Sequence, residues 1–141
     1  MAQTNEPLLS VKGLKQYFPV SKKFTVRAVD NISFDIYPGE TYGLVGESGS
    51  GKSTTGRSII RLYDPTEGTI LFNGEDISKK LTAKQEKMLR SDMQMVFQDP
   101  MASLNPHKKI LDTIAMGLDA HHPHMDQKER VERVSKMMEM V

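Results

Sequence analysis

The sequence predicts an α/β fold in which an antiparallel sheet precedes a strand, a glycine-rich loop and several helices. Apolar and polar residues alternate with a period of two over residues 24–36, which is typical of strands with one solvated face. The glycine-rich segment 46–54 lies between a short apolar run and a helix-forming segment, as in a strand–loop–helix unit. Apolar residues at helical spacing recur over 110–118 and 131–141.

The segment before the loop is expected to form the antiparallel sheet. Its alternating apolar positions are Phe24, Val26, Ala28, Ile32, Phe34 and Ile36. Pro38 and Gly39 predict a turn, and the apolar run 41–45 predicts a short strand that leads directly into the loop.

The segment after the loop is expected to begin with a helix over 52–62. A strand is predicted over 69–72, and Asn73 with Gly74 favours a hairpin turn at its end. A further short apolar strand is predicted over 93–97, after which regular structure is expected to break.

Capping patterns predict where three further helices begin. The pairs are Thr82 with Gln85, Asn105 with Pro106, and Asp126 with Glu129. The first of these helices is expected to end near Arg90. The last has an apolar face that reaches Val141 without a glycine cap, so we expect the chain to stop within a helix.

The glycine-rich loop fits the pattern G-x-x-x-x-G-K-[ST], which is the phosphate-binding loop of nucleotide triphosphatases. Its residues are Gly46, Glu47, Ser48, Gly49, Ser50, Gly51, Lys52, Ser53 and Thr54. Glycines lack a Cβ atom, so the backbone can curve around a triphosphate and present its N–H groups. Lys52 is expected to reach the β- and γ-phosphates, Ser53 to coordinate Mg²⁺, and Thr54 to contact the α-phosphate side. A plain turn between strand and helix would need neither the lysine nor the hydroxyl behind it.

The overall composition excludes several classes of protein. The formal net charge is +1, from 19 basic and 18 acidic residues, so no global field attracts nucleic acid or anionic lipid. The absence of cysteine excludes a disulfide framework. The sequence shows no signal-peptide pattern and no run near the ~20 apolar residues of a membrane span, so we expect a cytosolic or peripheral chain.

Three segments carry a resemblance to a known family. They are the loop 46–54, the lead-in Ala28–Phe34, and a block that reads Phe-Gln-Asp-Pro over 97–100 and Ser-Leu-Asn-Pro over 103–106. The chain resembles the ATP-binding subunits of ABC transporters, most closely those of bacterial dipeptide and oligopeptide importers, from about Leu8 to Val141. The loop alone would indicate only a superfamily, whereas the block looks like the Q-loop of the peptide-importer branch.

The resemblance implies a P-loop NTPase core of the RecA-like type with an N-terminal antiparallel β subdomain, over about 8–97. It implies the Q-loop and the start of a helical subdomain over 98–141. Gln98 matches the glutamine that senses Mg²⁺ and the attacking water and couples the site to the membrane subunits. Phe18 matches the aromatic residue that stacks on adenine, with Tyr17 as the adjacent alternative. By position, Lys52 and Gln98 are therefore the catalytic candidates, and Ser53 and Gln98 are the metal candidates.

The resemblance also implies partners for an ATP- and Mg²⁺-dependent subunit at the cytoplasmic face of the membrane. They are a second ATP-binding subunit, homologous or identical, two transmembrane permease subunits and, indirectly, an extracellular or periplasmic peptide-binding protein. The LSGGQ-type signature, the Walker B strand and the switch histidine of the family do not occur in the sequence. We therefore expect the first part of a subunit, with weak nucleotide binding and essentially no turnover alone. The solute stays open, because nickel importers have very similar ATPases.

Two other clusters are not expected to be sites. His121, His122 and His124 are expected to lie in a solvated loop, because Pro123 interrupts them and they lack the helical spacing of metal ligands. The basic run between Lys79 and Arg90 is expected to be a solvated helix face, not a nucleic-acid site, because no aromatic residues interleave it. Two alternative functions stay open, namely a P-loop kinase and a non-catalytic nucleotide-binding module that occurs as a natural short form.

Overall fold

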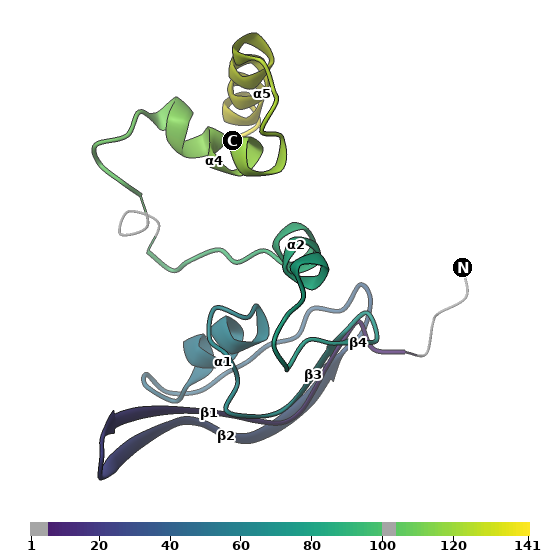
Figure 1. Cartoon of the computed structure of the whole chain (residues 1–141), viewed down its shortest axis with the longest axis vertical. Helices are drawn as coiled ribbons and strands as arrows, with labels where there is room; N and C mark the ends of the chain where they lie inside the picture. Colours follow the sequence, from purple (N-terminus) through teal and green to yellow (C-terminus); the bar gives the residue numbers. More distant parts are fainter. Residues whose placement is uncertain (1–5, 100–103) are drawn as a thin grey trace. The chain divides into compact units, whose positions relative to one another are not determined.

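The computed structural model describes residues 6–99 and 104–141 (Figure 1). The chain divides into two compact units, Met1–Met95 and Val96–Val141, each held together by its own internal contacts. Pro100 and Ser103 of the predicted Q-loop block lie outside the described residues.

The first unit is built on a four-stranded antiparallel sheet with the strand order β2-β1-β3-β4. The strands are β1 (Leu9–Ser21), β2 (Phe24–Ile36), β3 (Glu67–Phe72) and β4 (Glu75–Asp76). β1 pairs with β2 along its whole length and with β3 over its first part, so it is an inner strand. The predicted α/β fold with an N-terminal antiparallel sheet is confirmed.

One face of this sheet carries the hydrophobic core. Leu14 of β1, Ile70 of β3 and Ile77, which follows β4, have no exposed surface, and they cluster with other buried apolar residues. Two helices, α1 (Lys52–Ile59) and α2 (Ala83–Asp92), contribute Ile59, Met88 and Leu89 to the same cluster and lie on the same side of the sheet (Figure 1). Burial of these side chains is the main favourable term that holds α1, and hence the loop before it, on the sheet.

Two predicted strands do not form. Segments 41–45 and 93–97 are irregular, and neither pairs with a strand in the described part of the chain. A strand depends on a neighbour that receives its backbone hydrogen bonds, and an apolar run alone does not supply one. Val45 is 93% exposed and Val96 is 96% exposed, which agrees with the lack of such neighbours in this structure.

Local turn and cap chemistry is confirmed at three places. Asn73 and Gly74 adopt positive φ angles of 50° and 78° in the turn between β3 and β4. Thr82 and Gln85 form a complete capping box at the start of α2. The Asp126 side chain accepts hydrogen bonds from two backbone N–H groups at the start of α5 (Gln127–Glu139).

The helix predicted to begin at Asn105 and Pro106 begins later. The Asn105 side chain accepts a hydrogen bond of 2.9 Å from the His107 N–H and forms a local turn in place of a helix cap. The helix α4 spans Ile110–His121, with Lys109 at its N-cap. A side chain that caps a helix can close a turn equally well, and here the turn is formed.

An arginine joins the two helices of the second unit. Arg130 of α5 donates to both carboxylate oxygens of Asp119, at 2.8 and 3.0 Å, and to Asp112 at 3.2 Å. Both aspartates belong to α4, and each helix also buries one apolar side chain, Ala115 of α4 and Val134 of α5. The paired geometry links α4 to α5 at a defined register.

The second unit is therefore expected to lose stability in acid. The hydrogen bonds from Arg130 lower the pKa of Asp119 below its usual range. A carboxyl group with a lowered pKa stabilises the fold above its unfolded pKa, and the contribution is lost as the pH falls through its folded pKa. The melting temperature of the helices of the second unit, followed by circular dichroism, should fall as the pH drops below about 5, and most of the fall should lie below about pH 4. In Asp119→Asn the fall should be smaller, and an equal fall would contradict this assignment.

Candidate nucleotide-binding site

The glycine-rich loop ends at the N-terminus of α1, as predicted. Gly51 is the N-cap, with no side-chain cap and no acidic residue in the first turn of the helix. The N–H of Thr55 bonds to the Gly51 carbonyl oxygen at 2.8 Å, which closes the first helical turn. Within the described residues, the N–H groups of Lys52, Ser53 and Thr54 have no hydrogen-bond acceptor. These groups and the positive end of the helix are available to an anion.

Gly51 lies against β2 so closely that only glycine fits. A Cβ atom at this position would lie 2.2 Å from the carbonyl oxygen of Ala28, and the φ angle of Gly51 is +91°. The loop also curves on itself, because a Cβ atom at Gly46 would lie 2.7 Å from the Ser50 hydroxyl oxygen. Gly51 is therefore required for the path of the backbone, whereas a Cβ atom at Gly46 would require only that the Ser50 side chain turn away.

The Lys52 ammonium group lies inside the curve of the loop. Its Nζ atom donates to the carbonyl oxygens of Gly46 at 2.8 Å and Glu47 at 2.6 Å, and to the Ser50 hydroxyl at 3.3 Å. The side chain thus bridges the two ends of the loop. A phosphate oxygen is a stronger acceptor for this charge than a neutral carbonyl.

The hydroxyl groups of the first helical turns fall into two kinds. Thr55 donates to the Gly51 carbonyl at 3.0 Å, and Ser58 donates to the Thr54 carbonyl at 2.9 Å, so both serve the helix itself. The predicted ligands Ser53 and Thr54 have no partner for their hydroxyl groups among the described residues. The structure therefore leaves free the two hydroxyls that the motif assigns to Mg²⁺ and phosphate.

The two aromatic candidates lie on opposite faces of β1. Tyr17 donates its hydroxyl to Asp30, which raises the pKa of Tyr17, and the Arg27 guanidinium lies 5.5 Å from the centre of its ring. Phe18 points to the other face, where its ring meets Tyr63 edge to face at 5.3 Å. Successive residues of a strand alternate in this way.

The face of Phe18 is also the face on which α1 packs. Gln16, two residues before Phe18, accepts a hydrogen bond of 3.2 Å from the buried Ser58 hydroxyl of α1. Of the two aromatic candidates, this geometry favours Phe18. Sequence reasoning missed both Gln16 and Tyr63, because neither belongs to the loop motif and each meets its partner only through the fold.

Gln98 lies in the second unit, at a bend, with an exposed side chain. Its proposed roles toward Mg²⁺ and the attacking water concern the loop in the first unit. These roles therefore stay a prediction.

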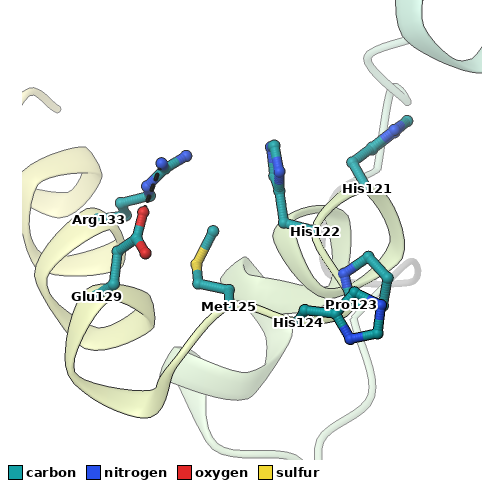
Figure 2. Close-up of a pocket in the computed structure, with 7 residues that line it drawn as sticks. All are labelled: His121, His122, Pro123, His124, Met125, Glu129 and Arg133. Carbon is teal, nitrogen blue, oxygen red and sulfur yellow. Dashed lines mark hydrogen bonds and ion pairs between the residues drawn. The ribbon is translucent and has the colours of Figure 1, made fainter.

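His121 is the last residue of α4, while His122 and His124 lie in the loop before α5, so the predicted loop holds only two of the three histidines. All three line a shallow surface pocket (Figure 2). The three imidazole rings point in different directions and do not converge on a common centre. Glu129 and Arg133, on the facing side of the pocket, form an ion pair of 2.6 Å with each other. In the described ranges, no group of three histidine or acidic side chains is arranged to hold a metal ion.

Comparison with known proteins agrees with this geometry. A family model described as ABC transporter matches residues 29–141. The oligopeptide transport ATP-binding protein OppF of Bacillus subtilis (strain 168) is 56% identical over 136 residues, which cover 96% of this chain and 44% of that protein. The dipeptide transport ATP-binding protein DppF of Lactococcus lactis subsp. cremoris (strain MG1363) is 46% identical over 136 residues, which cover 95% of this chain and 43% of that protein. The chain thus spans less than half the length of these relatives.

Solved structures show the same fold. A bacterial ABC transporter cassette determined as a dimer superposes with a TM-score of 0.80 at 26% identity, over 94% of this chain and 56% of that one. The same cassette in a post-hydrolysis state, bound to ADP and phosphate, gives a TM-score of 0.79. The match of the family model over most of the sequence shows that this chain belongs to the ABC transporter family.

Proposed function

We propose that the chain forms the nucleotide-binding part of an ATP-binding subunit in an ABC importer of dipeptides or oligopeptides. The observation that supports this most is the loop 46–54, a single short segment that holds free N–H groups, a lysine ammonium and two free hydroxyls. The substrate class rests on similarity to proteins named as oligopeptide and dipeptide transport ATP-binding proteins. Membership of the ABC transporter family argues against the P-loop kinase alternative.

The residues present fit ATP with Mg²⁺. The free N–H groups at the start of α1 would bind a polyphosphate, and Lys52 would neutralise part of its charge. Ser53 would be a ligand of Mg²⁺, which supplies charge neutralisation at the phosphates when it is bound. Phe18 would stack on the adenine ring, and Gln98 would act from the Q-loop. Base stacking on an aromatic side chain contributes about 1–3 kcal/mol.

The partners follow from the same proposal. ATP binding would join two such subunits, and the dimer of the similar cassette supports this arrangement. Two permease subunits would receive the motion at the cytoplasmic face of the membrane, and an external binding protein would deliver the peptide. Among the helices that the structure describes, none is both long and apolar enough to cross a bilayer.

Calorimetric titration with MgATP tests the proposal, and Ser53→Ala tests the metal role. The wild type should bind MgATP, and Ser53→Ala should weaken this binding about tenfold, because a hydroxyl ligand to a charged group is lost. In the presence of a chelator, Ser53→Ala should change the affinity for ATP less than about twofold relative to the wild type, since Mg²⁺ is then absent.

Ser91→Ala is a matched control for this experiment. It removes a hydroxyl that donates only to a carbonyl within α2, at 3.1 Å from the Lys87 oxygen. MgATP affinity should not change in this variant. Absence of heat with the wild type would overturn the proposed function, whereas an equal loss with and without Mg²⁺ in Ser53→Ala would overturn only the metal role.

A further inference from the structure

The aromatic contact of Phe18 depends on a turn that the P-loop motif does not include. Tyr63 follows α1 in the chain and meets the Phe18 ring at 5.3 Å, with an angle of 83° between the ring planes. Perpendicular aromatic pairs of this kind are attractive, because the positive edge of one ring faces the negative face of the other. The contact restricts rotation of the Phe18 ring.

The position of Tyr63 is set by Arg57 of α1. The Arg57 carbonyl accepts the N–H of Leu62 at 2.9 Å and of Tyr63 at 3.4 Å, and the Arg57 guanidinium donates to the Tyr63 hydroxyl at 3.4 Å. Arg57 lies on the helix that begins at Lys52. The turn is therefore attached to the same helix that would hold the phosphates.

A second arginine holds the turn from its other side. Arg61 has a positive φ angle of 60° and ends the helical path, although the sequence predicted helix to residue 62. Its side chain is only 3% exposed, and its guanidinium donates to Asp64 at 2.6 Å and to the carbonyl oxygens of Ile77 and Lys79. A left-handed arginine is costly, so it persists only where such contacts determine it. The turn that carries Tyr63 is thus held at both ends.

The sheet register places Phe18 beside the loop. Phe18 pairs with Val26 of β2, and Val26 lies two residues before Ala28, whose carbonyl oxygen faces Gly51. Two residues of a strand span roughly 7 Å. A base attached to phosphates in the loop could therefore reach the Phe18 ring.

We propose that Tyr63 is a positioning residue for the nucleobase, which fixes the Phe18 ring in the orientation that stacks on adenine. The inference rests on the proposed function and deepens it. Tyr63 lies outside the loop 46–54, so its contribution would concern the base alone. A purely structural role would instead change the affinity for every ligand of the loop to the same extent.

The experiment compares two probes, MgATP and magnesium tripolyphosphate, which has no base. Tyr63→Leu should weaken MgATP binding about three- to tenfold, in the range of one aromatic contact, and should change tripolyphosphate binding less than about twofold. Tyr63→Phe keeps the ring pair and loses only the long hydroxyl bond, so it should restore MgATP affinity to within about twofold of the wild type.

Tyr37→Leu is the matched control, because the Tyr37 side chain is exposed outside the turn. It should leave both affinities unchanged. If Tyr63→Leu does not fold, Arg57→Gln is tested in its place. This variant should also lose affinity for MgATP selectively, by a smaller factor. A wild type that binds neither probe would overturn the proposed function. Binding of both probes with no selective loss of MgATP in the variants would overturn the role of Tyr63 alone.

Discussion

Gly51→Ala is expected to abolish MgATP binding and to destabilise the first unit. The added Cβ atom would lie 2.2 Å from the carbonyl oxygen of Ala28, and the φ angle of +91° is itself unfavourable for alanine. The overlap and the backbone strain together should cost about 3 kcal/mol or more. The N-terminus of α1 must then move away from β2, which disrupts the phosphate-binding loop 46–54. Thermal unfolding measures the loss of stability, and calorimetry with MgATP measures the loss of binding.

Gly49→Ala separates the two causes. Gly49 also has a positive φ angle, +80°, but a Cβ atom there would meet no atom within 4 Å. Only the backbone strain remains, so the loss of stability should be about 1–2 kcal/mol. The difference between the variants measures the close approach of the loop to β2. Equal stabilities would show that this approach is not present in solution.

Features with partners nearby in the sequence were predictable. The turn at Asn73 and Gly74 needs only residues that tolerate positive φ, and the capping box of Thr82 with Gln85 needs only a spacing of three. The phosphate loop is of the same kind, because its charge, its glycines and its hydroxyls all lie within one short segment. The motif therefore identified the candidate site without the fold.

β1 shows why some regular structure is harder to locate. Its buried apolar residues lie at odd positions up to Val11 and at an even position at Leu14, because the pairing with β2 is irregular between them. Gly13 adopts a φ angle of 59° at this point. A single alternating pattern misses such a strand, whereas two half-patterns on either side of a glycine would indicate a bulge and could have located it.

Features that depend on distant partners could not be predicted. The segments 41–45 and 93–97 have strand-like composition, but strand formation depends on a neighbour, and the described residues provide none. The contacts of Gln16 with Ser58 and of Phe18 with Tyr63 join residues more than forty positions apart. Only the fold brings such pairs together, so these two contacts could be found only in the structure.

Lys52→Ala is expected to weaken MgATP binding at least about a hundredfold, because hydrogen bonds from a charged donor to phosphate contribute about 1.5–3 kcal/mol each. Stability should change by less than about 0.5 kcal/mol, since the carbonyls of Gly46 and Glu47 are exposed and would bond to water instead. A large loss of affinity without a change in melting temperature identifies a ligand-binding lysine. A large fall in melting temperature would show that Lys52 mainly holds the loop together.

Lys23→Ala controls for net charge. Lys23 lies exposed in the turn between β1 and β2, so its removal changes the charge of the chain by the same amount. A distant exposed charge is screened within about 10 Å at 0.1 M salt, so MgATP affinity should change less than about twofold. If the two variants lost affinity equally, the attraction would belong to the whole chain. A loss confined to Lys52→Ala shows that the ammonium acts at short range, from inside the curve of the loop.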